Sequence, residues 1–178
     1  VCTGDVSDNT IVIGTDRGRT TGIEIEGDIS ELTVSNNSIT GGYYGMDISA
    51  IEIGPLQISG NLIENSQIGM RISGRDRSGS WGGMNDVTYK QNTIKGTQTG
   101  LLITNLYWGR AVPADVTQEK DGSLVWKEVT LSKLNFVDVD SAIVLIDVND
   151  SLAIEILDSY FGTTDLEAIG NLITDNAD

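Results

Sequence analysis

Short segments in which hydrophobic and polar residues alternate recur along the whole chain. In Leu32–Ile39, Leu56–Ile63 and Val87–Ile94, two alternating apolar residues precede an Asn, and another apolar residue follows two positions after it. A period of two is typical of β-strands, whereas amphipathic helices have an apolar period of 3.6. The pattern therefore predicts an all-β chain of short strands separated by Gly, Asn and Asp.

A second segment follows each of these Asn residues. In three copies, Gly45–Ile48, Gly69–Ile72 and Gly100–Ile103, it begins eight residues after the Asn. Weaker copies flank them, so the chain holds six copies, with the Asn-type positions at residues 9, 37, 61, 92, 134 and 159. A repeat of roughly 24 residues with three short strands cannot bury its apolar side alone, so the copies must stack as a solenoid.

The recurring Asn has a physical explanation. A tight corner needs a residue in the left-handed conformation, which Asn tolerates, and stacked Asn side chains can hydrogen-bond along their column. We therefore expect each Asn to occupy the corner between two strands.

The repeats resemble the right-handed parallel β-helix of the pectate-lyase-like superfamily, over nearly the whole chain. The residues that carry the resemblance are the corners Asn37–Ile39, Asn61–Ile63 and Asn92–Ile94 and the Gly segments that follow them. A leucine-rich repeat is not expected, because its L-x-x-L-x-L spacing and helical segment are missing. The expected fold is a single domain over residues 1–178, a right-handed parallel β-helix solenoid of about six coils with long inserted turns. We also expect that this domain is a fragment of a longer chain, because neither end of the sequence carries an amphipathic capping helix.

Composition excludes several kinds of chemistry. The net charge is −15, from 26 acidic and 11 basic residues, which argues against a nucleic-acid partner. No apolar stretch is long enough for a membrane helix, so no membrane insertion is expected. The chain has no His, which excludes Ser-His-Asp chemistry and imidazole zinc sites, and its single Cys2 cannot form an internal disulfide. The groups that remain for catalysis or binding are the side chains of Asp, Glu, Arg, Lys and Tyr and a cation bound by oxygen ligands.

The resemblance assigns three strands to each coil: strand one is the Gly segment, strand two precedes the Asn, and strand three follows it. Insertions then fall at residues 12–20, 73–86 and 104–128, in turns that flank strand one. In the superfamily the substrate cleft runs along the outside of that strand. All six Arg and all three Trp lie in or beside these insertions.

We therefore predict that the insertions bind substrate. Arg binds carboxylates bidentately, and aromatic rings offer flat platforms for sugars. The predicted substrate-binding residues are Arg17, Arg19, Arg75, Arg77, Trp81, Tyr107, Trp108 and Arg110. The alternative is that the Trp side chains anchor long loops and the Arg side chains form ion pairs with nearby acids. Tyr43 and Tyr44, in a Gly-rich turn, could likewise contact a ligand or close the turn.

Strand one carries an outward-facing column of charged residues. Alternation directs Glu24, Asp47 and Arg71 outward on consecutive rungs, about 4.8 Å apart. Two carboxylates one rung apart can share a calcium ion, so Glu24 and Asp47 are the candidate metal ligands. The resemblance implies that such a calcium ion bridges to the substrate's uronate and that Arg71 is the catalytic base, which makes these three the candidate catalytic residues. The alternatives are a cross-strand salt-bridge ladder and a two-carboxylate glycosidase.

These observations predict an extracellular or cell- or virion-surface protein that binds an anionic polysaccharide. Calcium-assisted β-elimination is the favoured reaction, ahead of glycoside hydrolysis. The alternative is a non-catalytic glycan-binding or structural β-helix module of a viral tailspike, fibre or adhesin. Residues 142–146 are apolar on both faces, so the turn 104–128 should cover them, or a second copy should do so in a homo-oligomer such as a trimer.

Overall fold

The chain folds as a parallel β-solenoid. The computed structural model describes residues 2–14, 20–26, 29–49, 52–53, 55–73, 83–84, 87–104, 129–146, 154–163 and 165–176. Within these residues the strands form three sheets, and the chain passes from one sheet to the next as it winds. The expected all-β solenoid class is thus confirmed.

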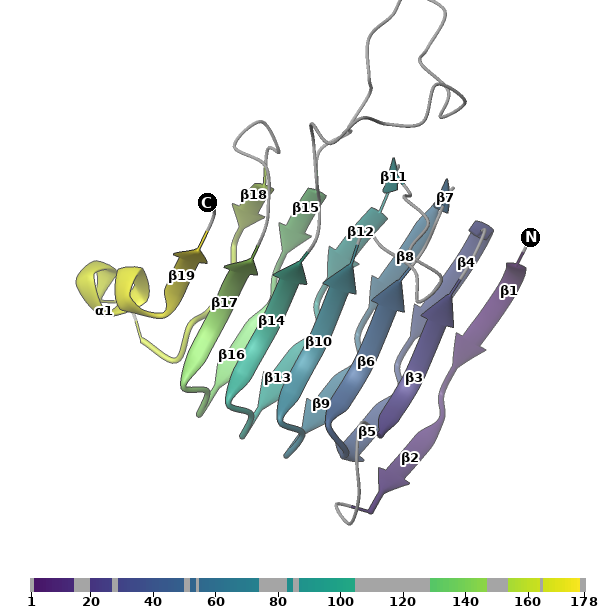
Figure 1. Cartoon of the computed structure of the whole chain (residues 1–178), viewed down its shortest axis with the longest axis horizontal. Coiled ribbons are helices and arrows are strands. Elements are labelled where there is room, and N and C mark those ends of the chain that lie inside the picture. Colours follow the sequence, from purple (N-terminus) through teal and green to yellow (C-terminus); the bar gives the residue numbers. More distant parts are fainter. Residues whose placement is uncertain are drawn as a thin grey trace, which may run out of the picture.

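Sheet 1 is made of strand one from each coil. Figure 1 shows its strands side by side, with the N-terminal strands at one end and α1 beyond the other. In spatial order they are β3 (Thr21–Glu26), β6 (Tyr44–Ser49), β10 (Ile68–Ser73), β14 (Thr99–Thr104), β17 (Ser141–Ile146) and β19 (Ile173–Asn176).

The other two sheets hold the strands on either side of the Asn corner. Sheet 2 holds strand two: β1 (Cys2–Ser7), β4 (Ile29–Ser35), β8 (Leu56–Ser59), β12 (Val87–Lys90), β15 (Val129–Ser132) and β18 (Ile154–Leu157), with β7 (Glu52–Ile53) and β11 (Gly83–Met84) extending from β4. Sheet 3 holds strand three: β2 (Thr10–Ile13), β5 (Ser38–Gly41), β9 (Leu62–Glu64), β13 (Thr93–Lys95) and β16 (Asn135–Val137). Because β2 ends at Ile13, the first inserted turn begins later than the expected residue 12.

The number of turns differs from the expectation. From β2 to β16 the chain completes about four turns, where six coils were expected. Beyond β16, the described residues continue sheet 3 as an isolated bridge between Asn135 and Tyr160. In the described part of the chain the last repeat therefore matches the pattern in sequence without a full set of three strands.

A short helix lies at the C-terminal end of the solenoid. Helix α1 (Leu166–Asn171) begins after Asp165, whose carboxylate accepts the backbone N–H groups of Glu167 and Ala168 at 2.9 and 3.2 Å. Ile169 of this helix packs partly buried against the core. No helix in the described part of the chain has the length and apolar character needed to cross a membrane.

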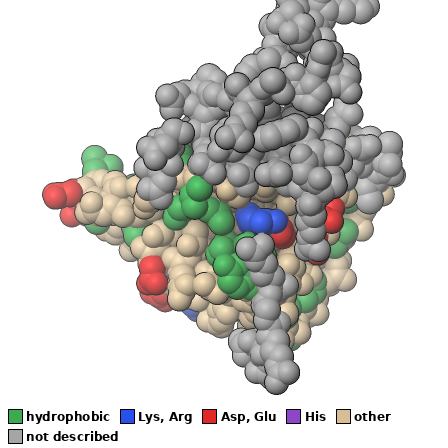
Figure 2. Space-filling model, in the orientation of Figure 1, with side chains coloured by type: hydrophobic (Ala, Val, Ile, Leu, Met, Phe, Trp, Pro, Cys, Tyr) green, Lys and Arg blue, Asp and Glu red, His purple; other side chains and the backbone are tan. Residues whose placement is uncertain are grey.

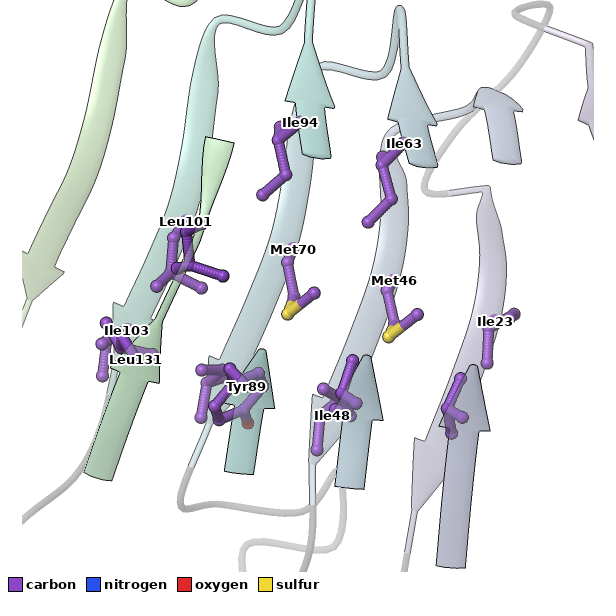
Figure 3. Close-up of a cluster of buried hydrophobic side chains, with 14 of the residues drawn as sticks. Ile23, Met46, Ile48, Ile63, Met70, Tyr89, Ile94, Leu101, Ile103 and Leu131 are labelled. Carbon is purple, nitrogen blue, oxygen red and sulfur yellow. The ribbon is translucent and has the colours of Figure 1, made fainter. Parts of the chain in front are cut away.

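The core consists of columns of apolar side chains between the three sheets. Ile23, Met46 and Met70 occupy equivalent positions on neighbouring strands of sheet 1, and all three are buried as expected. Figure 3 shows the two Met side chains pointing the same way from adjacent strands. In sheet 2, Tyr89 aligns with Ile58 and is fully buried, and this burial raises the pKa of its phenol.

The Asn column forms a continuous hydrogen-bonded ladder. The side-chain amide of Asn9 donates to Oδ1 of Asn37 at 2.8 Å, Asn37 donates to Asn61 at 2.9 Å, and Asn61 donates to Asn92 at 2.9 Å. Each acceptor oxygen also binds the backbone N–H of the preceding Asn. The ladder ends at Asn92 because Leu134 occupies the next position.

The structure corrects the expected conformation of these corners. The left-handed residue is the one before each Asn-type position, not the Asn itself. The residues with positive φ at these corners are Asp8, Asn36, Gly60, Gln91, Lys133 and Asp158. This residue makes the turn, and at three of the corners the side chain that follows it, Asn37, Asn61 or Asn92, is buried and bridges the rungs.

Gly69 illustrates how closely sheet 1 approaches the opposite wall. A Cβ atom added there would contact Cγ2 of Ile94 and lie 2.7 Å from the carbonyl oxygen of Gly100. We expect Gly69→Ala to lower the free energy of unfolding by about 1–3 kcal/mol, measured by chemical denaturation, because the core must shift. Gly170→Ala is the control, since nothing lies within 4 Å of its added Cβ. Equal stability of the two variants would contradict this account of packing.

Candidate functional site

The predicted charged column lies on consecutive rungs of sheet 1. Glu24 on β3 aligns with Asp47 on β6, and Asp47 aligns with Arg71 on β10. The column continues with Leu102 on β14 and Val144 on β17. Because the residues before and after each of these positions are directed into the core, the column faces outward. The alignment expected from the repeats is therefore confirmed.

Asp47 and Arg71 form a bidentate ion pair. Arg71 Nε donates to Asp47 Oδ1 and Nη2 donates to Oδ2, both at 2.7 Å. Arg71 Nη2 also donates to Ser49 Oγ at 3.2 Å, and this hydroxyl in turn lies 3.4 Å from Asp47 Oδ1. Although it faces outward, Asp47 is only 2% exposed. The pair thus joins a buried carboxylate to a partly buried guanidinium, whose side chain is 17% exposed, and such a directional contact is stronger than an exposed surface salt bridge.

An aromatic ring lies beneath the guanidinium. The Cζ atom of Arg71 lies 4.8 Å from the centre of the Tyr44 ring, within cation–π range. Partial burial disfavours the charged guanidinium, but the hydrogen bonds and negative charge of Asp47, together with Tyr44, outweigh it. The pKa of Arg71 is therefore raised above its ordinary value.

The described residues fit a calcium site poorly. Calcium takes six to eight oxygen ligands, and both carboxylate oxygens of Asp47 already accept hydrogen bonds from Arg71. Glu24 is exposed on the neighbouring rung. Among the described residues, no group of three or more acidic or thiol side chains is placed to hold a metal.

Apolar side chains lie beside the ion pair on the same face. Leu102 and Val144 are half-buried, and Ile146 is 37% exposed. Figure 2 shows a basic and an acidic group side by side on this face, with hydrophobic side chains next to them. The expected cover, residues 104–128, lies almost wholly outside the described residues, and the homo-oligomer stays a prediction.

The predicted substrate-binding residues are outside the part of the chain that the structure describes. These residues are Arg17, Arg19, Arg75, Arg77, Trp81, Tyr107, Trp108 and Arg110. Conversely, Ser49 belongs to the site and was not predicted. Its position two residues after Asp47, on the same face of a strand, was the signal in the sequence.

The structure confirms one part of the resemblance to the pectate-lyase-like superfamily, namely the parallel β-solenoid. Membership of that superfamily and the chemistry that it implies stay predictions. Comparisons of the chain with protein-family models, with curated proteins and with solved structures find no significant match.

Proposed function

We propose that this chain is a non-catalytic module that binds an extracellular polysaccharide along the outer face of sheet 1. The observation that carries the proposal is the bidentate pair of Arg71 and Asp47 in the middle of that face. The pair supplies a fixed polar group next to apolar side chains. Fixed polar groups on a largely apolar surface are a common arrangement in sites that orient a ligand.

Two features of the pair favour binding over cleavage. A catalytic base must be able to lose its proton, whereas the pKa of Arg71 is raised by its surroundings. A carboxylate that coordinates calcium or attacks a sugar acts best when its charge is not already paired, whereas both oxygens of Asp47 accept hydrogen bonds from Arg71. The ion pair therefore makes Asp47 a poorer metal ligand and a poorer nucleophile, which disfavours the lyase and hydrolase alternatives.

The repeat of the face suits a linear polymer. Neighbouring rungs of a sheet are about 4.8 Å apart, close to the length of one sugar unit in an extended chain. Polar Asp47 and Arg71 are followed along the same column by apolar Leu102 and Val144. A polysaccharide presents both hydroxyl groups and apolar C–H surfaces, so it can contact both kinds of side chain. The Arg residues of the inserted segments are the sequence feature that favours an anionic sugar.

The proposal is tested by incubating the protein with anionic and neutral polysaccharides, with calcium and with a chelator. Affinity electrophoresis measures binding, and mass spectrometry measures products. We expect binding without soluble products, and no effect of the chelator. Unsaturated fragments that appear only with calcium would establish a lyase, saturated fragments a hydrolase, and both would overturn the proposal. Failure to bind any glycan would overturn it in favour of a structural module.

A pair of variants localises the binding face. We expect Leu102→Glu, in the centre of the outer face of sheet 1, to weaken binding of an anionic polysaccharide by about tenfold or more. Val12→Glu adds the same charge on sheet 3, where Val12 is 78% exposed, and should leave binding unchanged. Circular dichroism of both variants checks that the solenoid is retained.

A further inference from the structure

Two consecutive tyrosines, Tyr43 just before β6 and Tyr44 as its first residue, are held in place by the rung before them. Gly41 and Gly42 adopt φ values of 86° and 85°, which other residues rarely adopt, and so shape the turn. The backbone N–H of Tyr43 donates to both the carbonyl oxygen and Oγ1 of Thr20, at 2.9 and 3.1 Å, and that of Tyr44 donates to the same carbonyl at 3.0 Å. The backbone that carries both rings is therefore fixed.

The two rings have different surroundings. Tyr44 is 5% exposed and its ring lies beneath the Arg71 guanidinium. Tyr43 is only half-buried, and its ring contacts that of Tyr44 edge to face, with centres 4.7 Å apart and planes at 80°. Tyr44 thus contacts both the Arg71 guanidinium and the ring of Tyr43, and Tyr43 is the more exposed of the two tyrosines.

We propose that Tyr43 is an aromatic subsite that stacks one sugar ring of the polysaccharide. This inference rests on the proposed function and adds the class of sugar, a pyranose with its C–H bonds gathered on one face. That apolar face packs on the Tyr43 ring, because the π face of an aromatic ring attracts the weakly positive hydrogens. The ring edge, with its hydroxyl or carboxylate groups, is then directed towards Arg71.

Arg71 has a donor for this second contact. A guanidinium carries five N–H groups; within the described part of the chain, the contacts with Asp47 and Ser49 use three of them and a hydrogen bond with Tyr44 uses a fourth. Asp47 and Tyr44 hold the guanidinium in one orientation, so it binds a sugar without losing side-chain freedom at that step. Stacking on Tyr43 and hydrogen bonding to Arg71 together fix both the plane and the direction of the sugar.

The test compares three variants in the same affinity electrophoresis. Tyr43→Ala should weaken binding about threefold to tenfold, as expected for the loss of one stacked ring. Tyr43→Phe keeps the ring and should bind within about twofold of the wild type. Tyr160→Ala removes a tyrosine that is 48% exposed and pairs with sheet 3 at Asn135, and it should have no effect.

Each outcome separates the subsite from the proposed function. If the wild type binds a polysaccharide and Tyr43→Ala binds equally well, the subsite is wrong and the proposed function stands. If Tyr43→Phe loses as much affinity as Tyr43→Ala, the hydroxyl and not the ring makes the contact, and stacking is wrong. If the wild type binds no polysaccharide, both proposals fall. Circular dichroism shows whether each variant is folded, because an unfolded variant loses ellipticity. Binding is compared at a temperature at which the wild type and all three variants are folded.

Discussion

Replacing Arg71 with Leu is expected to lower the free energy of unfolding by about 2–4 kcal/mol, somewhat less than removing one partner of a fully buried ion pair, because the Arg71 side chain is 17% exposed. The physical reason is that Asp47, 2% exposed, would lose both of its bidentate hydrogen bonds and remain as a buried charge without a counter-ion. Urea denaturation of the wild type and the variant measures the difference.

The solvent-exposed pair of Lys95 and Glu64 is the matched control. Their charged atoms are 3.7 Å apart, and the side chains are 50% and 28% exposed. Lys95→Leu should therefore cost less than about 1 kcal/mol. A loss of similar size for Arg71→Leu would show that the Arg71 pair is an ordinary surface contact.

A double variant separates the attraction between the two charges from the cost of burying one of them without a partner. Asp47→Leu/Arg71→Leu removes both charges, and it should be more stable than Arg71→Leu alone, because no uncompensated carboxylate remains. If the double variant is less stable than the single one, then Asp47 stabilises the fold without Arg71, through contacts such as that with Ser49, and the account of an uncompensated buried charge is wrong.

The second large effect is expected at the Asn ladder. Asn61→Ala should lower the free energy of unfolding by about 3–5 kcal/mol, at 1–3 kcal/mol for each buried group left unpaired. Oδ1 of Asn61 accepts both the backbone N–H and the side-chain amide of Asn37, at 3.0 and 2.9 Å, and its own amide donates to the carbonyl of Val34 at 3.0 Å. These three contacts and the donation of the Asn61 amide to Oδ1 of Asn92, at 2.9 Å, are all lost in the variant.

Asn9 provides the comparison within the same ladder. It is exposed at the first rung and donates to Asn37 and to the carbonyl of Ser7. Asn9→Ala should cost only about 1 kcal/mol, because water can replace an exposed partner. Equal losses at positions 9 and 61 would contradict the view that burial makes the ladder strong.

Leu134 shows how the ladder can end without loss of the fold. At this corner the backbone N–H of Leu134 donates to Ser159 Oγ at 3.1 Å, so that a hydroxyl takes the place of the amide. The buried Leu134 side chain joins the apolar core. The position therefore needs a satisfied backbone N–H more than it needs an Asn.

The local sequence pattern predicted the positions of the charged column. A period of two decides which residues of a strand face the core, and a repeated spacing decides which residues share a rung. These two regularities were enough to align Glu24, Asp47 and Arg71 correctly. They were not enough to count the turns, because a repeat at the end of a solenoid can match the pattern and still lack one strand.

The sequence by itself thus determined the strands, the inward columns and the rung on which each charge lies, since these follow from periodicity, whereas the assignment of three strands to each coil came from the resemblance to the parallel β-helix. Only the tertiary structure decided what the charges do. Whether Asp47 is free to bind a cation or is held by Arg71 depends on burial, on the rotamers of both side chains and on Tyr44 and Ser49 around them. In the same way, only the folded corner shows that the residue before each Asn makes the turn. Such contacts join residues from different rungs, and no local pattern contains them.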